Sequence, residues 1–196
     1  TDYRMLLDGR LRPPDIAGWF RGDWWQNFWQ RFFVFAGPPP EAEVDIRGRW
    51  REPWRSNNFV HAHARQVTVW GGDFDEVDAT VFVRPNFAHA WNLDAHRAQG
   101  TQRLAGWFKR TANGPGDPGR FEFDFAGNPD SAALGRLLEG RANDVLATLQ
   151  FQHPPELHAW GAIDQGVPRY DFTGAAREPL HYFGFPLESA AVTGSA

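Results

Sequence analysis

Cysteine is absent from this chain of 196 residues, and its absence removes several kinds of chemistry. Disulfide bridges, thiolate nucleophiles, cysteine-ligated zinc and iron–sulfur clusters all need cysteine and are therefore excluded. A chain without disulfides fits a reducing compartment, so we expect a cytoplasmic protein. The opening residues lack the basic and then apolar stretches of a secretion leader, although a leader that had been cleaved would leave no trace.

The sequence also has little lysine, a small net charge and no long apolar run. Lys109 is the only lysine, and 20 Lys and Arg against 24 Asp and Glu leave a net charge of −4. Nucleic-acid binding needs a strongly basic face, so we expect no nucleic-acid partner. A membrane-spanning helix needs about eighteen consecutive apolar residues. The sequence contains no such run, which predicts no transmembrane segment.

Aromatic residues are what the chain has in excess. It holds 17 Phe and 10 Trp but only 3 Tyr, and 42 % of its residues are hydrophobic. This length and composition predict a single domain over residues 1–196 with a well-filled core. Within it we expect an N-terminal extension over 1–40, a β domain over 41–187 and a frayed tail over 188–196.

From residue 41 onward the sequence is typical of short strands at close spacing. Residues 59–70 alternate, so that one face would carry Phe59, His61, His63, Arg65, Val67 and Val69. Similar patterns cover 77–83, 87–96, 104–111 and 120–125, and further strands are expected within 145–152 and 157–163. The Gly- and Pro-rich residues 112–119 predict a long hairpin connection. Together these signals predict a mainly β fold, either an antiparallel β-barrel or a β-sandwich.

Local signals also predict a hairpin and two helices. Asp8-Gly9 is a two-residue turn signal between short apolar runs, so we expect a hairpin over residues 4–12. An amphipathic helix is expected within residues 16–36, with its best part after Gly22, and Gly37 followed by three prolines would end it. Asn128-Pro129 predicts the start of a short helix over residues 129–139.

The expected N-terminal helix would have an almost wholly aromatic face. Its aromatic pairs recur close to the helical period and comprise Trp24, Trp25, Phe28, Trp29, Phe32 and Phe33. Such a face must be buried against the protein's own core, a ligand, a protein partner or second copy, or a membrane surface. Membrane-surface helices carry many Lys and Arg on their polar face, and this segment does not. The pattern therefore favours burial in the core first and docking to a partner second.

His61 and His63 are the sharpest chemical feature, because residues two apart on a strand share a face. A third histidine, His89, lies on a later expected strand. This arrangement resembles that of the cupin family, in which an HxH strand and a later histidine hold iron, manganese or another metal. The resemblance implies a first-row divalent metal held by His61, His63 and His89. Where the family has an acidic ligand this chain offers only Gln66, so water or carboxylates as hydrogen-bond partners are the interpretation we favour.

The tryptophans outside the helix outnumber what an ordinary core requires, and some could line a cavity. The candidate residues are Trp70, Phe87, Trp91 and Trp107, with Arg65 and His89 as polar anchors. Our first hypothesis is therefore binding of an apolar or ring-containing small molecule. One alternative is an enzyme, either metal-dependent and cupin-like or a cofactor-free cyclase or isomerase. Another is a structural subunit that docks onto a larger assembly through the aromatic helix.

Overall fold

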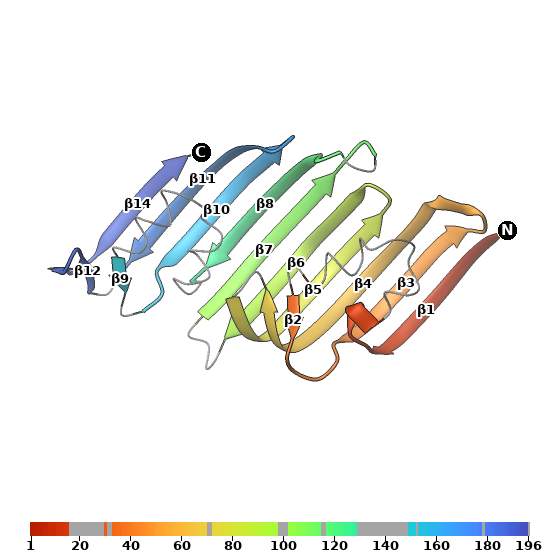
Figure 1. Cartoon of the computed structure of the whole chain (residues 1–196), viewed down its shortest axis with the longest axis horizontal. Helices are drawn as coiled ribbons and strands as arrows, with labels where there is room; N and C mark the ends of the chain where they lie inside the picture. Colours follow the sequence, from red (N-terminus) through yellow and green to blue (C-terminus); the bar gives the residue numbers. More distant parts are fainter. Residues whose placement is uncertain are drawn as a thin grey trace.

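The chain was described from a computed structural model, which covers residues 1–15, 30, 33–69, 72–97, 102–114, 117–128, 149–151, 153–177 and 179–195. This part of the chain is built almost entirely of β-strands, and all strand pairs are antiparallel (Figure 1). The main sheet contains, in spatial order, β1 (Asp2–Arg10), β3 (Glu41–Arg49), β4 (Glu52–Val69), β5 (Gly72–Arg84), β6 (Phe87–Arg97), β7 (Gln102–Thr111), β8 (Arg120–Gly127), β10 (Glu156–Asp164), β11 (Val167–Ala176) and β14 (Ala190–Ser195).

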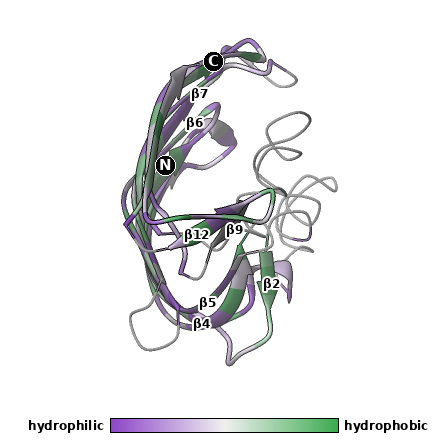
Figure 2. Cartoon of the chain, turned by 90° about the vertical axis from the view of Figure 1, so that its left-hand side faces the viewer, coloured by the Kyte–Doolittle hydropathy of each residue, from purple (hydrophilic) through white to green (hydrophobic). Residues whose placement is uncertain are grey.

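Four short strands complete the described part of the chain. The strand β2 (Phe33–Phe35) pairs with the end of β4 and is the eleventh strand of the main sheet. A separate small sheet contains β13 (Phe185–Leu187), β12 (Leu180–Tyr182) and β9 (Leu149–Phe151) in that order. Seen from the side, the main sheet is curved, and β2, β9 and β12 lie on its concave side (Figure 2).

The main sheet is open, and this decides part of the predicted fold class. A mainly β, antiparallel architecture is confirmed. Closure into a barrel is wrong, because β1 and β14 lie at opposite ends of the strand order (Figure 1). Closure depends on pairing between the first and last strands, and local alternation carries no information about that pairing.

The strong curvature has identifiable local causes. Trp91 and Asn92 of β6 lie together opposite Trp107 of β7, which is a β-bulge that increases the twist of the strands. Gln66 of β4 has a φ of 51°, in the left-handed region, and its carbonyl accepts hydrogen bonds from the backbone N–H groups of Ala36 and Gly37. These bonds bring the chain leading out of β2 against the bend in β4.

The well-buried core is small and lies beside the bend in β4. Val67, Phe74 and Ala95 are buried there. The half-buried apolar residues packed against them are Phe33, Phe35, Ala64, Val69, Val77, Leu93 and Leu104. Because Gln66 breaks the alternation, Ala64 and Val67 face the same cluster. The predicted grouping of Val67 and Val69 with His61 and His63 is therefore wrong.

Three further predictions are corrected by the strand pairing. No turn forms at Asp8-Gly9, since all nine residues of β1 pair in register with β3 and long-range pairing overrides the turn signal. Residues 33–35, expected in a helix, form β2. The rest of that expected helix, apart from Gln30 and Ala36, lies outside the described residues, as does the helix over 129–139. The expected frayed tail contains β14, which pairs with β11.

Candidate functional site

The two faces of the main sheet differ in chemistry, and the register shows this residue by residue. Neighbours across the strands form continuous rows, because paired residues point to the same face. One row runs across nine strands through Leu7, Val44, Val60, Val81, Ala90, Phe108, Phe123, Gly161 and Tyr170. A second crosses ten strands through Gly9, Ala42, Ala62, Ala79, Leu93, Gly106, Phe125, Ala159, Phe172 and Gly194.

A third row continues the same apolar face toward the buried cluster. It contains Ala64, Val77, Ala95, Leu104, Gly127, Leu157, Gly174 and Val192. None of the three rows contains a charged side chain. We call these three rows the apolar lane. It lies on the concave side, since Phe33 and Phe35 of β2 pack there against the cluster that contains Ala95 (Figure 2).

The dimensions of the apolar lane suit an elongated molecule better than a compact one. Ten strands at about 4.8 Å spacing make a lane about 43 Å long, and three rows about 7 Å apart make it about 14 Å wide. Many of its side chains are only half-buried, and at its two ends Leu7 is 43 % exposed and Val192 56 % exposed. Among the described residues, the lane is therefore exposed at its two ends and partly accessible between them.

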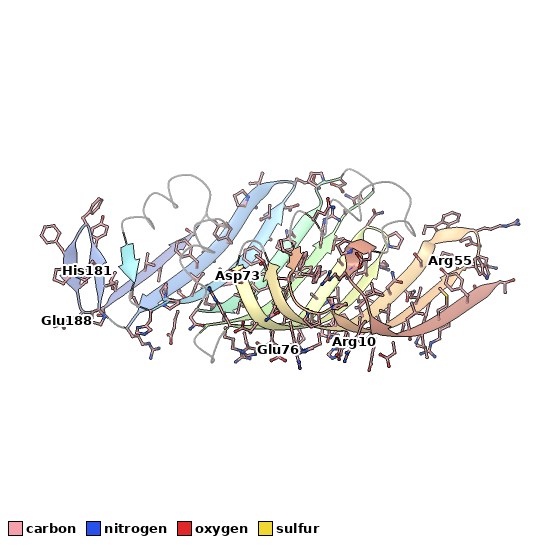
Figure 3. All side chains as sticks on the ribbon, turned by 60° about the horizontal axis from the view of Figure 1, so that its bottom comes forward. Arg10, Arg55, Asp73, Glu76, His181 and Glu188 are labelled. Atoms are coloured by element: carbon pink, nitrogen blue, oxygen red, sulfur yellow. The ribbon has the colours of Figure 1, made fainter. Side chains whose placement is uncertain are left out.

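The opposite, convex face is polar and carries many ion pairs. Figure 3 shows Arg10 and Glu76 projecting from this side. Arg4 and Arg47 both bind the carboxylate of Asp45 and hold its pKa well below the usual range. Hydrogen bonding from Arg103 lowers the pKa of Asp94, and hydrogen bonding from Lys109 does the same for Glu122. These pairs are exposed to solvent, so each contributes little to stability.

Four of the predicted ligand-binding residues gather on this convex face rather than in a cavity. His89 lies centrally, with ring-centroid distances of 5.3 Å to Trp91, 6.2 Å to Trp107 and 6.4 Å to Phe87. Phe59 joins the group at 5.5 Å from Trp91. We call these five residues the aromatic patch. It is partly exposed, since Trp91 is 43 % and Trp107 36 % accessible.

The other two predicted ligand-binding residues do not join the aromatic patch. Arg65 lies farther along β4, where its Nε donates a hydrogen bond to Nε2 of His63. Trp70 lies outside the described residues. Of the predicted partner-docking residues, Trp24, Trp25, Phe28, Trp29 and Phe32 also lie outside them, whereas Phe33 belongs to β2 and packs on the core.

The three candidate metal ligands are not brought together. His61 and His63 lie on β4 and His89 on β6, with β5 between them, so the register places His89 at least about 10 Å from the other two. Among the described residues, the side chains that come close enough to hold one metal ion are His63, Glu76 and Asp78, and neither His61 nor His89 belongs to this group. His61 instead bonds to Oγ1 of Thr80 at 3.1 Å. The cupin-like ligand set is therefore not formed.

His63 has a different set of polar neighbours, Glu76 and Asp78, whose ligand atoms lie within 4.8 Å of one another. Nδ1 of His63 is 2.9 Å from Asp78, whereas Glu76 lies 3.3 Å from the other ring nitrogen, Nε2. The two carboxylates thus face different nitrogens of the imidazole ring. Arg65 also donates to Nε2, which places a positive charge where a cation would bind. The arrangement is that of an ion-pair network across strands.

Comparison with models of protein families, with curated proteins and with solved structures found no match to this chain. Among the described residues, no helix has the length and apolar character needed to cross a membrane. The interpretation of the site therefore depends on its own geometry.

Sequence reasoning missed the apolar lane, although its signal was present. Val60 and Val81 were each placed on one face of an alternating strand, and Phe108 was placed within a strand over 104–111. Their combination into one continuous surface becomes visible only when the register of every strand pair is known. Small residues such as Ala79 and Gly106, which carry little apolar signal alone, complete the rows.

Proposed function

We propose that this protein binds an elongated apolar molecule, such as a long-chain fatty acid, along the apolar lane. The observation that carries the proposal is the uninterrupted run of apolar residues across nine or ten paired strands on one face. An apolar surface of this extent that remains accessible is typical of a binding surface, because burying it releases ordered water.

The shape and the chemistry of the lane both suit a flexible hydrocarbon chain. The rows run perpendicular to the strands, so a ligand lying along them would contact many strands at one or two residues each. Hydrocarbon makes no hydrogen bonds, so a surface without charged groups imposes no desolvation cost on polar side chains. A polar headgroup would be accommodated along one long side of the lane, where Asn58 of β4 and Arg110 of β7 lie in the row next to Val60 and Phe108.

A matched pair of variants tests this proposal on one strand. Ala79 and Thr80 are neighbours on β5 and point to opposite faces, so the same carboxylate can be placed in the lane or outside it. The probe is cis-parinaric acid, a fatty acid whose fluorescence rises in apolar surroundings. We expect the native chain to bind it, Ala79→Glu to weaken binding about tenfold or more, and Thr80→Glu to leave it nearly unchanged. Absence of binding by the native chain, or equal effects of both variants, would overturn the proposal.

The aromatic patch supports a second candidate function, binding of a ring-containing molecule. Trp91 and Trp107 expose ring surface beside His89 on the convex face. Stacking on exposed aromatic rings contributes about 1 kcal/mol per ring pair beyond buried area. Trp107→Ala would weaken binding of a planar ligand such as an indole, and Ala79→Glu would not. The two candidate functions are therefore distinguished by the face on which a substitution weakens binding, concave for the apolar lane and convex for the aromatic patch.

A further inference from the structure

The outer edge of the main sheet at β1 is unusually open for an edge strand. Natural edge strands are protected by charged side chains, especially lysine, by proline, by bulges or by short length. By contrast, β1 has nine residues, contains neither lysine nor proline, and pairs with β3 without any register shift. The four charged residues of β1 are two Asp and two Arg, so they repel a second copy only in registers that bring like charges together. Leu6 at its centre is 68 % exposed. Among the described residues no strand pairs with the other edge of β1.

We propose that β1 pairs antiparallel with β1 of a second copy of this chain, about a two-fold axis at Leu6. The sequence of β1, DYRMLLDGR, is complementary to itself in this register. Asp2 would lie opposite Arg10 of the second copy, Arg4 opposite Asp8, and Leu6 opposite Leu6. Because the pairing is symmetric, each of the two ion pairs occurs twice.

The faces of the two strands agree with this register as well. Asp2, Arg4, Leu6, Asp8 and Arg10 all point to the convex face, as their partners on β3 show. On the concave face, Met5 would lie opposite Leu7 and Tyr3 opposite Gly9. The pairing would thus place charge against opposite charge on one face and apolar residues together on the other. It would also continue the apolar lane from one copy into the next.

Neighbouring registers of the same pairing are disfavoured by charge. A shift of two residues in one direction would place Asp2 opposite Asp8, and a shift in the other direction would place Arg4 opposite Arg10. Like charges directly opposite each other destabilise a strand pair. A shift of one residue would move charged side chains to the apolar face. The register centred on Leu6 therefore has no close competitor.

The strand at the other end of the sheet lacks such a pattern of charged residues. The strand β14 has six residues, AAVTGS, and none of them is charged. Pairing of β14 with itself or with β1 of another copy would satisfy backbone groups but would add no ion pair between the two strands. The observations therefore favour a closed dimer through β1 over an open filament.

The test measures the oligomeric state of the full chain by analytical ultracentrifugation. We expect a dimer for the native chain and a monomer for both Leu6→Lys and Asp8→Arg. Asp8 lies directly opposite Glu43 of its own chain, so Asp8→Arg turns a like-charge pair into an ion pair and should not lower thermal stability. The control with the same charge change is Asp171→Arg on β11, which should remain dimeric. A native chain that stays monomeric, or variants that dimerise as well as it does, would overturn the proposal.

Two complementary experiments locate the symmetry axis. A mixture of Leu6→Lys and Leu6→Glu chains should form a heterodimer, although each variant alone is monomeric, because lysine then meets glutamate at the axis. The chain has no cysteine, so Leu6→Cys offers one thiol per copy. Directly paired residues lie about 4.5–5.5 Å apart, within the range of a disulfide, so oxidation should link two copies. Val192→Cys on β14 should not link efficiently, and linking at both sites alike would contradict the register.

Discussion

At the scale of single residues, the clearest electrostatic feature is Asp117 in the connection between β7 and β8. Its carboxylate accepts hydrogen bonds from the backbone N–H groups of Asn113 at 2.7 Å and Gly119 at 2.9 Å, and from Nε2 of Gln165 at 3.0 Å. These bonds favour the charged form and lower the pKa of Asp117 to about 2, with the bond from Asn113 contributing most. One carboxylate thus ties this loop to the turn between β10 and β11.

The lowered pKa of Asp117 predicts a defined pH dependence of stability. The unfolded group has a pKa of about 3.9, so its contribution is complete above that pH and is lost as the pH falls toward about 2. We expect Asp117→Asn to be less stable than the native chain at neutral pH. The gap between their urea midpoints should narrow as the pH falls through this window. A gap that stayed constant down to pH 2 would show that the charge of Asp117 plays no part.

At the scale of elements, the turn between β10 and β11 shows how backbone conformation alone can determine the effect of a substitution on stability. Gln165 and Gly166 form a two-residue connection with φ values of 51° and 80°. Two consecutive residues in the left-handed region are typical of the hairpin turn that matches strand twist. Space is open around Gly166, so a methyl group added there would meet no neighbour. The cost of a side chain at this position would come from the backbone.

Gly166→Ala should therefore destabilise the protein by about 1 kcal/mol in urea unfolding. The matched control is Gly114→Ala in the connection between β7 and β8. Gly114 also has open space around it, but its φ lies outside the left-handed region. This substitution should be neutral or stabilise by up to about 1 kcal/mol, because it restricts the unfolded chain. Similar effects of the two substitutions would exclude backbone conformation as the cause.

The elements also mark how far sequence reasoning could go. The strand predicted over 87–96 matches β6 to within one residue, and the long connection over 112–119 was confirmed, whereas β4 begins seven residues before the strand predicted over 59–70. The alternation over 87–96 predicted that Phe87, His89, Trp91, Leu93 and Ala95 share a face, and the first three do lie together. The bulge at Trp91 and Asn92 places Leu93 and Ala95 on the opposite face. What failed depended on distant parts of the chain. The turn signal at Asp8-Gly9 was overridden by pairing with β3.

The prediction that Val67 and Val69 share a face with His61 and His63 failed for a local reason, and no sequence signal indicates it. A single residue with positive φ moved Val67 and Val69 to the face opposite the histidines. Glutamine is not a residue type that signals the left-handed region, as glycine or asparagine would. The apolar lane remained hidden because it is a property of the register between strands.

At the scale of the whole molecule, the surface area agrees with an open architecture. A compact monomer of 22.2 kDa has an accessible surface of about 9,400 Å², whereas this chain has 12974 Å². The excess fits a single curved sheet whose two faces are both accessible over much of their extent. In the part of the chain that the structure describes, only β2 and the small sheet of β9, β12 and β13 lie over the concave face, so no full second layer covers it. Strand pairing therefore contributes much of the stability of this part.

This openness predicts that the native protein binds the dye ANS at neutral pH. ANS binding usually indicates a molten globule, which has lost its near-ultraviolet circular dichroism. Here the dye should bind while that signal, given by the many tryptophans, remains intact. Palmitate should displace the dye and raise the midpoint of thermal unfolding, since a ligand that binds only the folded state stabilises it. Ala79→Glu should reduce both effects and Thr80→Glu neither, because only Ala79 lies in the apolar lane. Native protein that does not bind ANS would mean that the lane is already covered.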